Sequence, residues 1–233
     1  MLSGFQLRQA RRARGWSQAY CAKKLGVSQS YVAMLEAGQR PASQRLARKA
    51  RQTLCLPPTS LPLPEPFEPP LPVDDQVFAE HLANLGWQPF GYVKNPHRRV
   101  LNPAEVLLTG LAQDNLEIRA VEALTWVLLQ VDETVHPWLV RNARVWNLQN
   151  RLGYLTDLAR RLEPDRTGLG ELWEQLDASR LAAEDTLCNA SMRPTMREWE
   201  RTHRPSAAAH WNLLTTLDLE HIMYQFENDE TES

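Results

Sequence analysis

QAYCAKKLGVSQSYVAMLEA, residues 18–37, has the spacing of two short helices that cross through a tight turn. Ala22 is small enough to let the two helices approach closely, and Gly26 can adopt a positive φ at the turn. Val32 and Leu35 are spaced to point back into the core. The pattern predicts a second helix that projects from the surface and can enter the major groove of DNA.

The residues on either side of this stretch fit the same arrangement. Ser17 and Ser28 stand where a helix N-cap is needed, and Gly38 stands just after the end of the second helix. A preceding helix is predicted at residues 7–14, stopped by Gly15, and a closing helix at 43–54 from the spacing of its apolar residues. Residues 1–56 are therefore predicted to form a compact helical domain.

Charge is distributed very unevenly along the chain. Residues 1–56 contain eleven Lys and Arg but one acid, Glu36, which gives a net charge of +10. The remaining residues hold fifteen bases and twenty-seven acids, a net charge of −12. A basic amino-terminal segment is the electrostatic signature of phosphate binding. The alternative is a solvated basic surface without a nucleic-acid role.

Residues 5–56 resemble the phage repressor/Cro family of helix-turn-helix domains, also called the xenobiotic-response-element type. The resemblance is carried by Trp16-Ser17-Gln18, by the turn Leu25-Gly26-Val27-Ser28-Gln29 and by Leu35-Glu36-Ala37-Gly38-Gln39-Arg40-Pro41. Cys21 stands where the family usually has Leu, which is a change in the core. The resemblance implies five short helices and sequence-specific binding of double-stranded DNA.

The same resemblance implies which side chains contact DNA. Gln29, Ser30 and Met34 would lie on the exposed face of the recognition helix, and Gln29 can form a bidentate pair with adenine. Gln18 and the arginines would hold phosphates. For Tyr31, packing under the helix is the alternative to contact with DNA. The full candidate set is Gln18, Ser28, Gln29, Ser30, Tyr31, Ala33, Met34, Gln39, Arg40, Arg11 and Arg14.

Eight of the sixteen prolines fall between Pro57 and Pro72. Such a run favours an extended polyproline conformation, so residues 57–75 are predicted to form a semi-rigid linker. A proline-rich ligand for an aromatic groove is the alternative. A second domain is predicted at 76–226, followed by a disordered acidic tail at 227–233.

The second domain has helical periodicity almost throughout, so the whole chain is predicted to be all-α. Asn102-Pro103 marks a helix start, and a long helix is expected at 137–162, within a bundle or as a short coiled coil. Residues 90–100 are interpreted as a hairpin or a loop. Further helices are predicted at 104–111, 118–131, 169–187, 195–202 and 206–226.

No pattern of catalytic or metal-binding residues stands out. Cys21, Cys55 and Cys188 are widely separated, and the grouping of His203, His210 and His221 matches no metal motif. We therefore expect no enzyme activity, no cofactor and no metal. The lack of a signal peptide or a long apolar span predicts a cytoplasmic protein with no membrane partner.

A second, shorter resemblance concerns residues 102–162. Asn102-Pro103-Ala104-Glu105-Val106 and Asn147-Leu148-Gln149-Asn150-Arg151-Leu152-Gly153 resemble the helical domains of bacterial repressors encoded beside abortive-infection-type nucleotidyltransferase toxins. That resemblance implies an autoregulating antitoxin with a toxin protein as its partner. The polar positions proposed for the partner surface are Arg141, Arg144, Asn147, Gln149 and Asn150.

Two other roles for the second domain remain open. One is a ligand-responsive repressor with a small molecule in a Trp-lined pocket, since seven of the eight Trp lie in this domain. The other is a bundle that serves only to oligomerise. A homodimer is expected in each case, because a small helix-turn-helix domain normally needs two half-sites.

Overall fold

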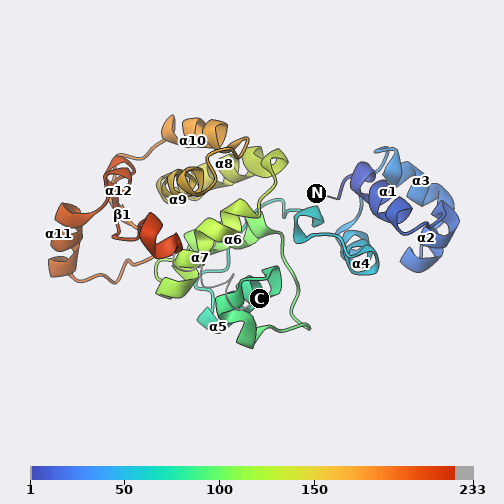
Figure 1. Cartoon of the computed structure of the whole chain (residues 1–233), viewed down its shortest axis with the longest axis horizontal. Coiled ribbons are helices and arrows are strands. Elements are labelled where there is room, and N and C mark those ends of the chain that lie inside the picture. Colours follow the sequence, from blue (N-terminus) through green and yellow to red (C-terminus); the bar gives the residue numbers. More distant parts are fainter. Residues whose placement is uncertain (1, 224–233) are drawn as a thin grey trace. The chain divides into compact units, whose positions relative to one another are not determined.

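The structure is a computed structural model that describes residues 2–223. The chain forms two compact units, which we call unit 1 (up to Pro66) and unit 2 (from Phe67) (Figure 1). Helices dominate both units, and the prediction of an all-α protein is confirmed. The predicted acidic tail at 227–233 lies outside the described residues.

Unit 1 is built from short helices, and a serine stands immediately before each of its four α-helices. Its elements are α1 (Gly4–Ala13), α2 (Gln18–Leu25), α3 (Gln29–Glu36), α4 (Gln44–Leu54) and the 3₁₀ turn η1 (Pro58–Ser60). Each of the four α-helices is capped by a serine side chain that accepts a backbone N–H, from Ser3, Ser17, Ser28 and Ser43 respectively. Such caps satisfy N–H groups that no helical carbonyl reaches, so the sequence itself fixes where each helix starts.

The core of unit 1 lies between these helices. Leu7 of α1, Cys21 of α2, Leu35 of α3 and Leu54 of α4 are buried together. α1 also approaches α3 very closely, because a Cβ added at Gly4 would lie 2.2 Å from the backbone oxygen of Leu35. Only glycine fits such a contact. The packing fixes α3 against α1 and α2.

Several residues of the proline-rich segment 57–75, which the sequence predicts to be a semi-rigid linker, pack within the unit to which they belong. Leu61 and Phe67 are almost fully buried, and the Phe67 carbonyl accepts a hydrogen bond from the Trp146 indole at 3.2 Å. The Pro70 carbonyl accepts one from Gln113 at 3.0 Å. The division between the two units falls inside this segment, between Pro66 and Phe67.

Unit 2 is a larger helical bundle. α6 and α7 pack together in its middle, with α5 on one side and α9 on the other (Figure 1). Every residue of α6 except Glu105 is buried. Its helices are α5 (Asp75–Leu85), η2 (Gln88–Val93), α6 (Pro103–Leu111), α7 (Ile118–Leu129), η3 (Glu133–Val135), α8 (His136–Val145), α9 (Gln149–Leu162), α10 (Leu169–Asp177), α11 (Pro194–His203) and α12 (Ser206–His210).

Several predicted elements of unit 2 are shorter than expected. The single helix predicted at 137–162 is broken into α8 and α9, because Asn147 adopts a positive φ of 56°. The helix predicted at 169–187 ends at Asp177. The one predicted at 206–226 is interrupted: α12 ends at His210, β2 (Leu213–Leu214) then pairs in parallel with β1 (Asp185–Thr186), and residues 219–223 are helical again. Residues 88–93 form the turn η2 rather than a strand of a hairpin.

Gly153 provides a test of how tightly unit 2 is packed. A Cβ at this position would lie 2.3 Å from the buried indole ring of Trp211, so Gly153→Ala forces the ring to move. We expect a loss of about 1–3 kcal/mol in the free energy of unfolding, measured by urea unfolding followed by tryptophan fluorescence. Gly170→Ala is the matched control, since no atom lies within 4 Å of its added Cβ. Equal effects of the two changes would contradict the packing argument.

Candidate DNA-binding surface

The turn between α2 and α3 fixes how α3 is presented. Gly26 ends α2 with φ 72°, and the Val27 N–H donates to the Ala22 carbonyl at 3.0 Å. On the inner face of α3, Val32 is fully buried and Leu35 is 4% exposed. The opposite face of α3 is consequently turned towards solvent, as the spacing of residues 18–37 predicts.

The first turn of α3 carries the most accessible polar side chains. Gln29 and Ser30 are exposed, whereas Ala33 and Met34 are half-buried beside them. Ser28 is exposed, and its hydroxyl caps α3 by accepting the Tyr31 N–H at 3.2 Å. The amide group of Gln29 and the hydroxyl group of Ser30 thus stand at the exposed end of a short projecting helix. This arrangement can form hydrogen bonds with base edges.

Tyr31 and Gln18 are less available than the sequence suggests. Tyr31 is half-buried and packs against the core of unit 1, which is the alternative interpretation of that residue. The Gln18 side chain donates from Nε2 to the Glu36 carboxylate at 3.0 Å. Gln18 remains half-exposed at the start of α2. Its amide group, however, is already hydrogen-bonded inside unit 1.

Arg11 is buried, although the sequence predicts that it holds a phosphate. Its guanidinium forms two hydrogen bonds with the Glu36 carboxylate, at 2.6 Å from Nε and 2.8 Å from Nη2. Nη1 donates to the Trp16 carbonyl at 2.7 Å. With only 10% of its side chain exposed, Arg11 cannot reach DNA, and its role is to tie α1 to α3.

Glu36 is the functional residue that the sequence pattern does not reveal. Burial would raise the pKa of its carboxyl group, but hydrogen bonds from Arg11 and Gln18 outweigh that effect and hold the pKa below its usual value. The carboxylate is therefore charged and neutralised internally. Glu36 is the single acid among residues 1–56, but the sequence does not indicate which of the eleven bases pairs with it.

Neutralisation of Glu36 leaves the surface of residues 1–56 positively charged. Arg14, Gln39 and Arg40 are exposed, as expected for side chains that hold flanking phosphates. Other exposed bases in the same range are Arg12, Lys23, Lys24, Arg45 and Lys49. A surface of this kind attracts duplex DNA irrespective of sequence.

Comparison with known proteins identifies the class of this domain. Residues 7–59 match the sequence model of the helix-turn-helix family, of the Cro/C1 type. The resemblance inferred for residues 5–56 is thereby confirmed, and the chain is a DNA-binding transcription regulator. A search of the curated proteins and of the solved structures found no significant match. Across residues 2–223, none of the helices combines the length and the apolar character needed to span a bilayer.

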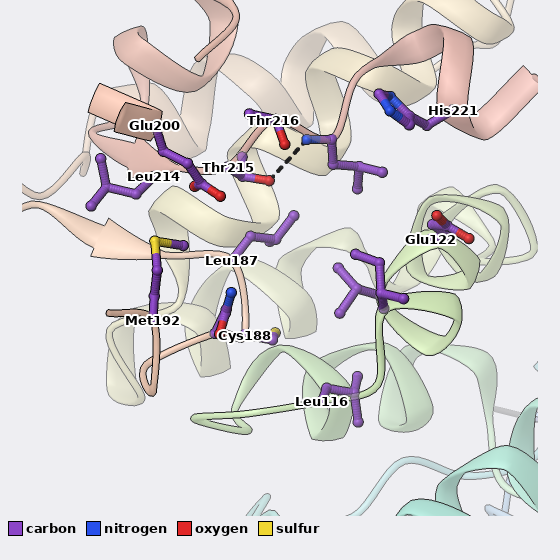
Figure 2. Close-up of a pocket in the computed structure, with 14 residues that line it drawn as sticks. Leu116, Glu122, Leu187, Cys188, Met192, Glu200, Leu214, Thr215, Thr216 and His221 are labelled. Atoms are coloured by element: carbon purple, nitrogen blue, oxygen red, sulfur yellow. Dashed lines mark hydrogen bonds between the residues drawn. The ribbon is translucent and has the colours of Figure 1, made fainter. Parts of the chain in front are cut away.

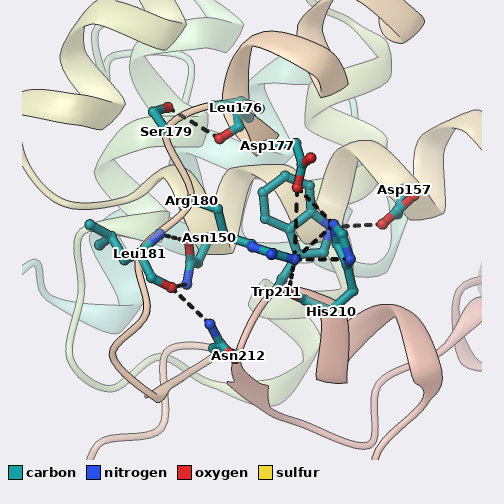
Figure 3. Close-up of polar contacts among 10 residues, drawn as sticks. All are labelled: Asn150, Asp157, Leu176, Asp177, Ser179, Arg180, Leu181, His210, Trp211 and Asn212. Carbon is teal, nitrogen blue, oxygen red and sulfur yellow. Dashed lines mark hydrogen bonds and ion pairs between the residues drawn. The ribbon is translucent and has the colours of Figure 1, made fainter.

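In unit 2, the five residues proposed for a partner surface do not share one face. Arg141, Arg144 and Asn147 are exposed, but Gln149 and Asn150 are buried. The Asn150 amide donates to the Leu181 carbonyl at 2.9 Å and accepts the Leu181 N–H at 2.8 Å (Figure 3). Gln149 and Asn150 are therefore withdrawn from the proposed surface, because burial excludes them from contact with a partner.

A neighbouring polar cluster likewise has a structural role. Arg180 donates to the His210 carbonyl at 2.6 Å, and the His210 ring pairs with Asp177 at 2.8 Å (Figure 3). The Trp211 indole donates to Asp157 at 2.7 Å. These contacts fasten α12 to α9 and α10. Within the described part of the chain, no group of three or more His, Cys, Asp or Glu is placed to hold a metal ion.

Proposed function

We propose that the protein is a sequence-specific transcriptional repressor that inserts α3 into the major groove of its operator. The observation that carries the proposal is the exposure of Gln29 and Ser30 at the first turn of a helix whose other face is anchored by Val32 and Leu35. The positive surface around α3 supplies the non-specific part of the affinity. Base edges then select the sequence.

We further propose that two copies bind one operator. A single α3 offers only a few side chains to bases, so specific binding requires two half-sites about one helical turn, roughly 34 Å, apart. Sedimentation of the complex with a selected duplex tests the stoichiometry. Two chains per duplex are expected, and one chain bound at full affinity would contradict the dimer.

Gln29→Ala is expected to relax base preference at one position of each half-site. The lost bidentate pair corresponds to about 1–3 kcal/mol of discrimination. Competition between the selected duplex and its single-base variants measures this, position by position. Unchanged discrimination at every position would show that Gln29 does not read a base.

Arg40→Ala is expected to weaken binding to all duplexes by a similar factor. Arg40 is exposed near the end of α3, and the loss of one phosphate contact should reduce the slope of log affinity against log salt concentration by about 1. The comparison with Gln29→Ala separates phosphate contact from base reading. A change in base preference in Arg40→Ala would contradict the assignment of Arg40 to phosphate contact.

We also propose a protein partner for unit 2, namely a toxin whose level controls repression. The supporting observations are the net charge of −12 on residues 57–233 and the short resemblance to toxin-paired repressors. A negative surface speeds encounter with a basic protein. Co-purification with the product of the adjacent gene, and rescue from its toxicity, are the expected results. An adjacent product that neither binds nor harms the cell would remove the proposal.

The alternative role for unit 2 is that of a sensor of a small molecule. It is supported by a cavity of about 340 Å³ in this unit, a size typical of ligand sites. None of the described residues that line this cavity is a Trp, so it is not the Trp-lined pocket that the sequence suggests. Under this alternative, a ligand raises the melting temperature of the protein and releases it from the operator. If the toxin released the protein from the operator and no metabolite did so, the antitoxin role would be favoured instead.

A further inference from the structure

The cavity in unit 2 lies between α7, the loop after β1 and the segment that follows β2 (Figure 2). Its lining is mixed. Apolar residues such as Leu116, Val121, Leu187 and Met192 alternate with a similar share of polar surface, to which Glu122, Asn189, Glu200, Thr215, Thr216 and His221 contribute. Apolar surface beside fixed polar groups can hold a small organic molecule that carries a polar end.

One of the polar groups is the carboxyl of Glu200, which reaches the cavity from α11 (Figure 2). The residue is 8% exposed, and its Oε2 atom is buried with no hydrogen-bond partner within residues 2–223. Burial raises the pKa of this carboxyl group. A buried carboxylate without a partner is costly, so a cation beside it would be stabilised strongly.

The other groups near the cavity fit this preference. Glu122 adds a second carboxyl group to the lining, and the His221 ring pairs with Asp218 at 2.6 Å. Among the described residues, the lining contains neither Lys nor Arg. The neighbouring arginines of α11 are engaged elsewhere: Arg197 donates to the Met192 and Ala190 carbonyls, and Arg201 pairs with Glu184 and Glu198. An anionic ligand would therefore meet repulsion, whereas an ammonium group would meet attraction.

We propose that this cavity binds a small organic cation, with its ammonium group beside Glu200 and its apolar body against Leu187 and Met192. The ammonium would compensate the charge of the Glu200 carboxylate, whose Oε2 atom has no hydrogen-bond partner within residues 2–223. Binding does not depend on how α3 reads DNA. Any effect of the ligand on operator binding rests on the sensor role proposed above. Ligand binding and operator binding are measured in separate experiments.

The test is calorimetric titration of the full chain at pH 7 with two probes of equal shape, phenethylammonium and the neutral 2-phenylethanol. We expect the cation to bind at least about tenfold more tightly, as for a charge-assisted hydrogen bond in place of a neutral one. Glu200→Gln should abolish the preference. Glu198→Gln, on the same helix but with 69% of its side chain exposed, should retain it.

Equal binding of the two probes, or no binding of phenethylammonium, would overturn the proposal. A second measurement uses the natural chain and therefore does not depend on the folding of a variant. Carbon-13 NMR of labelled glutamate should show the Glu200 carboxyl titrating at lower pH when phenethylammonium is present, because the cation stabilises its charged form. An unchanged titration would also overturn the proposal. Failure of DNA binding in a separate assay would affect only the function proposed for α3.

Discussion

Replacement of Glu36 by Ala is expected to lower the free energy of unfolding of unit 1 by about 3–5 kcal/mol, because it leaves the buried guanidinium of Arg11 without its counter-charge. The Glu36 side chain is fully buried and that of Arg11 is 10% exposed. Gln18 also loses its acceptor, the Glu36 carboxylate. Arg8 loses its ion pair with that carboxylate at 3.6 Å but keeps its hydrogen bond to the backbone carbonyl of residue 36. Most small domains would not tolerate a loss of this size.

Hydrogen exchange of the α1–α4 amides in the full chain measures this effect, and loss of operator binding should accompany it. The control is the double variant Arg11→Met with Glu36→Leu, which removes both charges. Replacement of a buried ion pair by apolar residues is often close to neutral, so the double variant should be more stable than Glu36→Ala alone. Protection equal to that of the natural chain in Glu36→Ala would refute the role we assign to this ion pair.

Arg151→Met is expected to lower the free energy of unfolding of unit 2 by about 1–3 kcal/mol, because buried carbonyls lose their donor. The remaining charge of Asp185, with 37% of its side chain exposed, stays partly solvated. The Arg151 guanidinium pairs with both oxygens of Asp185 at 2.7 and 2.9 Å. It also donates to the Leu111 carbonyl at 2.7 Å and the Gln113 carbonyl at 2.9 Å. One side chain of α9 therefore holds the end of α6 and the start of β1. Without it, two buried carbonyls lose their donor.

Urea unfolding followed by tryptophan fluorescence reports on unit 2, because seven of the eight Trp lie in it. Arg161→Met is the matched control, since Arg161 is exposed on the same helix, and its effect should stay within about 0.5 kcal/mol. If the two variants unfolded at the same urea concentration, the network around Arg151 would not be a main source of stability.

The architecture of unit 1 could be predicted from the sequence because its signals are local. Ser17, Gly26 and Ser28 each fix a helix end through their own backbone geometry or side chain. The buried positions Val32 and Leu35 follow from helical spacing alone. Contacts within a few residues determine this part of the fold, so a pattern along the chain is sufficient to reveal it.

The ion pairs could not be predicted because they join residues distant in sequence. Arg11 and Glu36 are 25 residues apart, and Arg151 and Asp185 are 34 apart. A basic side chain in a basic segment is typical of a phosphate contact, and nothing adjacent to Arg11 distinguishes it from Arg14. Only the packing of α1 against α3 places the Arg11 guanidinium on the Glu36 carboxylate.

Unit 2 departs from prediction for a related reason. The apolar spacing of residues 137–162 continues across Asn147, but this residue adopts a left-handed conformation that asparagine tolerates well. Gln149 and Asn150 are polar yet buried, because Asn150 satisfies the backbone of Leu181. Glu200 is likewise charged yet buried. The amino-acid type alone does not distinguish a polar side chain that forms hydrogen bonds inside the protein from one that is exposed to solvent.

Selection from a randomised duplex library is the most direct test of the central claim that α3 reads base edges. The full chain, at moderate salt, should enrich a short motif in two half-sites, and Gln29→Ala should lose the preference at one position of each half-site while retaining the rest. Enrichment of no motif over the starting library, despite retained binding to duplex DNA, would contradict the claim.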